Sequence, residues 1–75
     1  MQVAAYVLIQ AKGEDPWQIA KNVSKLNGVK MAHSVTGIYD VIAYIEVDDL
    51  KAIAQLVRKV HAIKGVERTH TAISA

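Results

Sequence analysis

The 75-residue chain contains no cysteine, no phenylalanine, a single proline and few aromatic residues. Without cysteine the protein cannot be stabilised by disulfides, and three histidines alone make a poor structural zinc site. A chain this short buries only about 60% of the surface that it exposes when unfolded, so its core alone gives little stability. Since 52% of its residues are hydrophobic, we expect another subunit to cover part of this apolar surface.

The sequence also lacks a long apolar run and a cluster of positive charge. A membrane-spanning helix needs about 20 consecutive apolar residues, and the first residues read as a strand and not as a signal peptide. From these two absences we expect a cytoplasmic protein without a membrane contact.

The net charge of +2 is carried by lysines that mostly stand singly. A nucleic-acid-binding surface shows clustered basic residues, so the charges indicate solvated helix faces.

Hydrophobic periodicity predicts four strands and two helices in the order βαββαβ. We expect the strands at 3–10, 29–36, 41–47 and 66–73. The first and third are apolar on both faces, as in the centre of a sheet, whereas the second and fourth are more polar. The first helix is expected from Pro16, after an Asp15 cap, to about Asn27. The second is expected from the acidic pair at 48–49 to the stop at Lys64 and the following glycine.

The two halves of the sequence resemble each other, which restricts the topology. The segment 26–35 (LNGVKMAHSV) aligns with 63–72 (IKGVERTHTA), so that His33 matches His70. Two βαβ halves predict the split βαββαβ arrangement of ferredoxin-like α+β proteins, with residues 1–75 forming one domain. Right-handed crossovers place the first and third strands in the middle of a four-stranded antiparallel sheet and both helices on one of its faces.

The second face of this sheet has no cover within the chain. It is expected to carry Tyr6, Leu8, Ile42 and Tyr44. A second subunit that packs sheet to sheet would bury this apolar surface, so we expect a homodimer. Glu46 lies on the same face and is interpreted as a polar partner at the subunit interface.

None of the polar residues forms a recognisable catalytic or metal-binding motif. The sequence has no HExxH motif, no glycine-rich phosphate loop and no nucleophile motif, so we expect no catalytic residue, no metal and no cofactor. His33 and His70 fall on opposite edge strands and cannot share a metal within one subunit. Trp17, in the first helical turn, is interpreted as a residue at the edge of the core, with a contact between subunits as the alternative.

The most distinctive local feature is the turn at 35–41 (VTGIYDV), which joins an edge strand to a central strand. An ordinary hairpin explains it, because Gly37 frees the backbone and Asp40 can cap turn amides. The alternative is half of a small-ligand pocket, in which Asp40 attracts an ammonium group and the turn amides bind a carboxylate. These are the two fixed groups of a free amino acid.

Together these features resemble the ligand-sensing (RAM) domain of the Lrp/AsnC transcriptional regulators. The residues that carry the resemblance are Thr36, Gly37, Tyr39, Asp40 and Val41 in the turn, and Gly65, Val66, Thr69 and Thr71 in the closing strand. In that family the effector-binding residues lie around the same turn and the same strand. The resemblance therefore implies a ligand-binding site formed by Gly37, Ile38, Tyr39, Asp40, Thr69, Thr71 and Ser34.

The resemblance also implies partners. Members of the family dimerise through their sheets, assemble into rings of dimers and bind small effectors, mostly amino acids, between dimers. Full-length members carry an N-terminal helix-turn-helix domain, whereas here the first expected strand begins at Val3. We therefore expect a stand-alone form that binds an amino-acid effector, does not bind DNA directly and could assemble with full-length Lrp/AsnC relatives.

Two other functions are compatible with the sequence. A small dimeric ferredoxin-like enzyme, of the monooxygenase or isomerase type, would use the same scaffold. Its polar residues could come only from Tyr6, Tyr44, Glu46 and His33 or His70. A plain assembly module without a ligand is the other alternative. Because no catalytic motif is present, the favoured function is a non-enzymatic, effector-binding and oligomerising regulatory domain.

Overall fold

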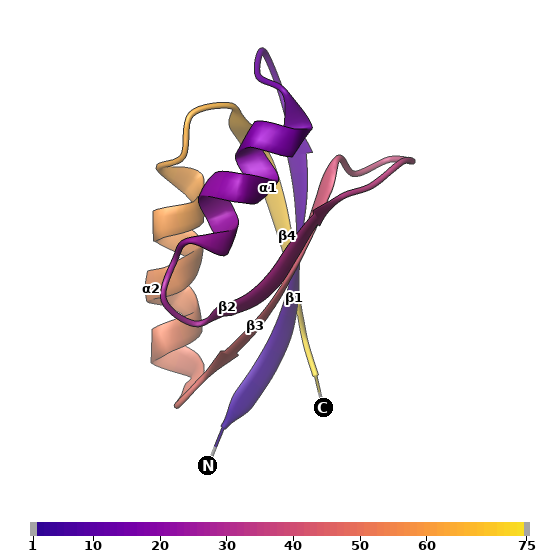
Figure 1. Cartoon of the computed structure of the whole chain (residues 1–75). Helices are drawn as coiled ribbons and strands as arrows, with labels where there is room; N and C mark the ends of the chain where they lie inside the picture. Colours follow the sequence, from indigo (N-terminus) through magenta and orange to yellow (C-terminus); the bar gives the residue numbers. More distant parts are fainter. Residues whose placement is uncertain (1, 75) are drawn as a thin grey trace.

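The two apolar segments of the sequence form the centre of a four-stranded antiparallel sheet. In the computed structural model, which describes residues 2–74, the elements are β1 (Val3–Ala11), α1 (Pro16–Ser24), β2 (Val29–Ser34), β3 (Val41–Val47), α2 (Leu50–His61) and β4 (Val66–Ile73). The strand order is β2-β3-β1-β4, and both helices cover the same face (Figure 1). The predicted ferredoxin-like split βαββαβ fold is confirmed.

The core lies between the sheet and the two helices. Alternate residues of the central strands point toward the helices and are fully buried: Ala5, Val7, Ile9, Val41, Ala43 and Ile45. The buried residues of the helices are Ile19, Ala20 and Val23 in α1 and Ile53, Leu56 and Val60 in α2. Among the described residues no polar or charged side chain is buried. Removal of apolar surface from water therefore holds the two layers together.

Helix α1 ends at Ser24, earlier than the predicted end at Asn27. The chain tightens there, because the Leu26 N–H donates to Val23 O (3.0 Å) and the Val29 N–H donates to Leu26 O (3.2 Å). Bonds between residues three apart are typical of the 3₁₀ turns found at helix ends. The prediction overestimated the length of the helix because the apolar spacing of the sequence continues through this tighter turn.

The sequence repeat appears in the structure as a repeated connection from helix to strand. After α2, the Ile63 N–H donates to Val60 O (3.1 Å) and the Val66 N–H donates to Ile63 O (3.2 Å). Gly28 and Gly65 occupy matching positions, with φ of 101° and 95°. Only glycine adopts this backbone region without strain, so both connections from helix to strand turn at a glycine.

Trp17 is exposed and does not lie at the edge of the core, so that interpretation was wrong. Its relative exposure is 76%. Ile19 and Val23 define the buried face of α1, and Trp17 lies about 200° around the helix axis from Ile19. The indole is therefore directed into solvent, while Asp15 caps the helix by accepting from the Trp17 N–H (3.0 Å).

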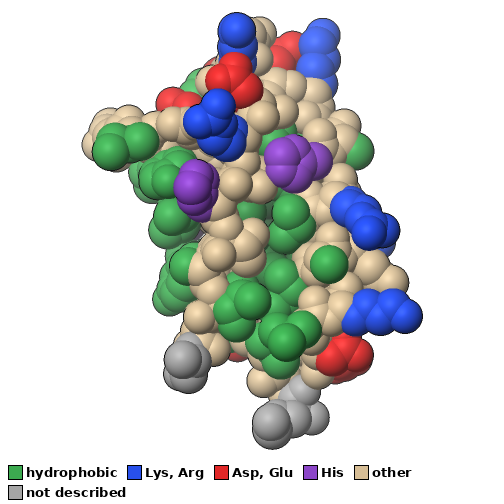
Figure 2. All heavy atoms as spheres, turned by 180° about the vertical axis from the view of Figure 1, so that it is seen from behind, with side chains coloured by type: hydrophobic (Ala, Val, Ile, Leu, Met, Phe, Trp, Pro, Cys, Tyr) green, Lys and Arg blue, Asp and Glu red, His purple; other side chains and the backbone are tan. Residues whose placement is uncertain are grey.

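The second face of the sheet is open, with apolar side chains gathered over it (Figure 2). Residues directly opposite one another in antiparallel strands point to the same face. The register places Tyr6 beside Tyr44 on this face, and their ring centroids lie 5.1 Å apart. Tyr6 is 42% exposed and Met31 is 38% exposed, so no element within residues 2–74 shields them fully from water.

A histidine stands at each end of one row across this open face. His33 pairs with Ile42, Ile42 pairs with Leu8, and Leu8 pairs with His70. The predicted placement of the two histidines on opposite edge strands is thus confirmed. Three strand spacings separate them, about 14 Å, which is too far for both to bind one metal ion within a subunit.

Gly65→Ala is expected to destabilise the fold more than Gly13→Ala. Both glycines have positive φ, 95° and 77°, so each substitution should cost about 1–2 kcal/mol of backbone strain. A Cβ at position 65 would also lie 2.5 Å from Glu14 Cβ and 2.9 Å from Ile19 Cδ1, whereas a Cβ at position 13 meets nothing within 4 Å. We expect urea unfolding to show an additional loss of about 1–3 kcal/mol for Gly65→Ala. Equal losses would contradict the close packing at Gly65.

Candidate functional site

The connection between β2 and β3 projects away from the helices at one end of the sheet (Figure 1). β2 ends at Ser34, before the predicted limit. The Val35 N–H still donates to Asp40 O (2.9 Å), which closes the base of the connection. Gly37 has φ of 120° and open space around it. Ile38 is 80% exposed. This segment therefore offers backbone amides and an apolar side chain to whatever approaches it.

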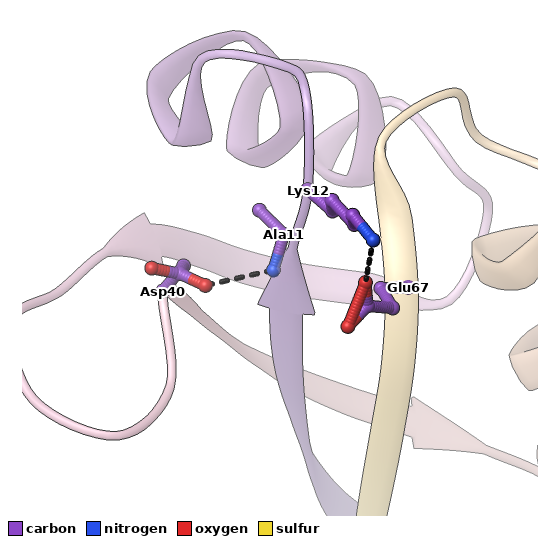
Figure 3. Close-up of polar contacts among 4 residues, drawn as sticks. All are labelled: Ala11, Lys12, Asp40 and Glu67. Carbon is purple, nitrogen blue, oxygen red and sulfur yellow. Dashed lines mark hydrogen bonds and ion pairs between the residues drawn. The ribbon is translucent and has the colours of Figure 1, made fainter.

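Three hydrogen bonds tie this connection to the end of β1. The Asp40 N–H donates to Ile9 O (2.8 Å). The Ala11 N–H donates to Asp40 Oδ2 (2.7 Å), and Figure 3 shows the carboxylate turned toward that amide. Gln10 Nε2 donates to Ile38 O (3.2 Å). The projecting segment is thus held to the sheet, and the residues of β1 that hold it are not recognisable from the turn motif alone.

Asp40 lies beside an irregularity in the pairing of β1 with β4. The register shifts between Gln10 and Ala11, and Glu67 is left without a direct partner in β1. Its carboxylate lies 3.8 Å from Lys12 Nζ (Figure 3). The Asp40 carboxylate therefore has a structural role as an acceptor for β1. Within residues 2–74 its other oxygen, Oδ1, accepts no hydrogen bond, and it is the atom that could meet a ligand ammonium group.

Tyr39 extends from the connection toward β4. Its ring lies edge-on to the ring of His70, with centroids 5.7 Å apart and an interplanar angle of 64°. His70 belongs to the open face of the sheet because it pairs with Leu8. The turn and the last strand therefore meet on the open face. His70 was not among the candidate site residues. The signal that could have drawn attention to it is its match with His33 in the internal repeat.

Thr69, Thr71 and Ser34 lie on the other face, which the helices cover. Each pairs with a buried core residue of β1 or β3. Thr69 Oγ1 is hydrogen-bonded to His61 Nε2 at the end of α2 (2.8 Å), and Thr71 is exposed. The structure brings Gly37, Ile38, Tyr39 and Asp40 together in one segment. Strand alternation directs Thr69, Thr71 and Ser34 to the face opposite to the one on which Tyr39 meets His70.

A groove of the surface is lined by none of the turn residues 35–41. It has a volume of about 500 Å³ and runs between α1 and β2. Trp17, Lys21 and His33 line it together with Ser34, which is the candidate site residue that borders it. Ser34 therefore faces a groove that the rest of the candidate site does not share.

Tyr44 and Glu46 form a polar pair on the open face. Tyr44 Oη donates to Glu46 Oε2 (3.0 Å). This hydrogen bond, followed by desolvation and by the negative charge of Glu46, raises the pKa of Tyr44 above its ordinary value. Tyr44 thus stays protonated at neutral pH and orients the carboxylate. The interpretation of Glu46 as a polar residue of this face agrees with its place in the register, opposite Ala4.

Two further kinds of feature are absent from residues 2–74. No three histidine, aspartate or glutamate side chains in that range are grouped so that they could hold a metal ion. None of the helices formed by these residues has both the length and the apolar character required to cross a bilayer.

A comparison with protein families identifies the family of the chain. The model of the Lrp/AsnC ligand binding domain matches residues 4–75. The chain belongs to this family. The resemblance deduced from the turn and the closing strand is thereby confirmed, and this Lrp/AsnC domain is of a kind found in transcriptional regulators.

Curated proteins that contain a similar segment include a regulator and an enzyme. The HTH-type transcriptional regulator LysM of Saccharolobus solfataricus is 26% identical over 73 residues, which cover 96% of this chain and 51% of the regulator. The chain therefore spans about half the length of this relative. The homocitrate synthase of the same organism is 29% identical over 55 residues, which cover 73% of this chain and only 12% of the enzyme.

Solved structures show the same fold. TTHA0845 from Thermus thermophilus superposes with a TM-score of 0.90 at 30% identity, covering 97% of this chain and 92% of that protein. The transcriptional regulator NMB0573 from Neisseria meningitidis, solved as a complex with L-Met, superposes with a TM-score of 0.82 at 16% identity. That alignment covers 97% of this chain and 49% of the regulator.

Asp40→Ala is expected to destabilise the domain by about 1–3 kcal/mol, because it leaves the Ala11 amide without its charged acceptor. Asp40→Asn keeps a side-chain oxygen that can accept from the same amide, so its loss should be smaller. Urea unfolding of the two variants measures the difference. If alanine were tolerated as well as asparagine, the bond between Asp40 and Ala11 would not support the turn.

Proposed function

We propose that residues 1–75 act as one regulatory domain that binds a free amino acid and self-associates, without catalysing a reaction. Membership of the Lrp/AsnC ligand-binding family carries this proposal. The complex of the NMB0573 regulator with L-Met supports an amino acid as the class of effector. Similar segments occur in a transcriptional regulator and in a small part of an enzyme. This supports a sensing module that can be joined to proteins of different function.

The proposed effector site is centred on the turn residues Gly37, Ile38, Tyr39 and Asp40. Backbone amides of the turn would bind the effector carboxylate, and Asp40 Oδ1 would accept from its ammonium group. Thr69, Thr71 and Ser34 would complete the site from a neighbouring subunit, because in their own subunit they lie on the face of the sheet opposite to Tyr39. An effector held between subunits in this way would bind an assembly and its free subunits with different affinities, and would therefore shift the assembly equilibrium.

The proposed dimer forms through the open face of the sheet. Burial of an aromatic or aliphatic side chain contributes about 1.5–3 kcal/mol, and this face offers Tyr6, Leu8, Met31, Ile42 and Tyr44. The exposed Ile38 at the turn suits a further contact between dimers, as in a ring of dimers. Full-length relatives such as LysM, similar over 96% of this chain, would be able to join mixed assemblies through the same surfaces.

Thermal unfolding across a panel of free amino acids tests the effector proposal. A ligand that binds only the native state, present at about 100 times its Kd, should raise the Tm by roughly 10–20 °C for a domain of this size. Light scattering on the same samples reports any change in mass. Ile38→Ala and Asp40→Asn should reduce the rise in Tm, whereas Leu50→Ala, which truncates another exposed aliphatic residue, should not. A stable oligomer that no amino acid affects would favour the assembly-only alternative.

Leu8→Asp is expected to dissociate the dimer into folded monomers, because it places a charge at the centre of the open face. Sedimentation velocity should then show a species of 8.2 kDa, with the circular dichroism of the native protein. Leu50→Asp introduces the same charge at an exposed position of α2 and should leave the mass unchanged. A wild-type protein that is folded and monomeric when dilute would refute the proposed dimer.

A further inference from the structure

The groove between α1 and β2 has an edge of the sheet as one of its walls, because β2 is an edge strand. Ala32 and Ser34 line the groove from β2. Trp17, Ala20 and Ser24 line it from α1 and lie within about 60° of one another around the helix axis. One side of a helix and one edge of the sheet therefore border the same groove.

The hydrogen bonds between β2 and β3 show which backbone groups of β2 are used within the sheet. The Val35 N–H donates to Asp40 O (2.9 Å), and toward the other end of β3 the Glu46 N–H donates to Gly28 O (2.9 Å). Successive residues of a strand turn their backbone groups to opposite sides. The even-numbered residues of β3 therefore bond to β2, and the odd-numbered residues bond to β1.

Ala32 and Ser34 lie opposite odd-numbered residues of β3, Ala43 and Val41. The N–H and C=O groups of Ala32 and Ser34 therefore point away from β3, to the free edge of the sheet. Within residues 2–74 neither residue forms a backbone hydrogen bond with a loop or a helix instead. A row of unpaired backbone groups at a sheet edge is a template for a further strand.

The chain around the groove carries positive charge. Residues 16–39 contain no aspartate or glutamate, whereas Lys21 lines the groove and Lys25 and Lys30 lie in the same stretch. The ion pairs formed among residues 2–74 involve other lysines. The acidic residue of the lining, Asp15, uses its carboxylate to cap α1 by accepting from the Trp17 N–H. This distribution of charge favours an acidic partner.

We propose that this groove binds an extended, acidic segment of a partner protein, which adds a strand to the sheet at Ala32 and Ser34. Backbone hydrogen bonds would supply affinity, and an apolar side chain of the segment would contact Trp17, which is 76% exposed. A second copy of this chain fits less well, because pairing of β2 with β2 would place two surfaces of the same positive charge side by side. The site does not depend on effector binding at the turn.

Fluorescence of Trp17, the single tryptophan of the chain, tests this site in the wild-type protein. The probe is the acetylated and amidated peptide Glu-Glu-Val-Ile-Val-Glu-Glu, which contains no aromatic residue. We expect its titration to change the emission of Trp17 and to reach saturation. The same peptide with lysine in place of glutamate should bind at least about tenfold more weakly, because it meets like charge.

Two N-methylated forms of the probe distinguish an added strand from a contact through side chains alone. The methyl groups are placed on two adjacent amides of the apolar core, only one of which can face β2. Binding should weaken at least about tenfold for one form, which loses a hydrogen bond and leaves a carbonyl of the edge unpaired, and change little for the other. Equal effects of the two methyl groups would overturn the added strand.

Two charge reversals provide a matched comparison. Lys21→Glu alters the lining of the groove, whereas Lys51→Glu makes the same change at an exposed position of α2 outside it. The titrations are made at about 0.15 M salt, where exposed charges more than about 8 Å apart are largely screened. Affinity for the acidic probe should fall about three- to tenfold in the first variant and remain unchanged in the second.

Several results would overturn the proposal: no binding of the acidic probe, equal binding of the acidic and basic probes, or equal effects of the two charge reversals. Sedimentation of Trp17→Ala then identifies another occupant. If the acidic probe does not bind and this variant forms a smaller assembly than the wild type, a second copy of the chain occupies the groove in place of an acidic segment.

Discussion

The antiparallel pairing of β1 with β3 is the interaction on which the rest of the structure depends. Its register runs from Val3 opposite Val47 to Ile9 opposite Val41. Because side chains alternate between faces, a slip of one residue would turn Val7 and its neighbours out of the core and expose them. The same register sets the composition of the open face and places the turn at one end of the sheet.

A four-stranded sheet with both helices on one face has a core on one side only. The apolar character of the other face is therefore a consequence of the fold and the composition together, and association is the simplest way to remove that face from water. Any ligand bound near a subunit contact in such a protein acts on assembly, provided that its affinity differs between the associated and the free forms. The proposed sensing and self-association would in this way be coupled by the architecture.

The candidate site illustrates what local motifs can and cannot tell. The turn was recognisable from the sequence, since glycine and aspartate at this spacing are typical of a tight connection between strands. The use of the Asp40 carboxylate by the Ala11 amide was not, because the two groups lie in different segments and meet only when β1 and β3 pair. The threonines of β4 were chosen by resemblance, and strand alternation then placed them on the face away from Tyr39.

The sequence by itself determined the order of the elements, the identity of the central strands and the family, because these follow from periodicity and short motifs that involve neighbouring residues. The predictions were wrong for the burial of Trp17, which depends on how α1 is rotated about its axis. They were also wrong for the end of α1, which depends on where the helix tightens into a 3₁₀ turn. Only the tertiary structure decided which polar groups share a surface. Tyr39 and His70 come from the turn and from β4, and their contact depends on how the strands pair, which no local pattern encodes.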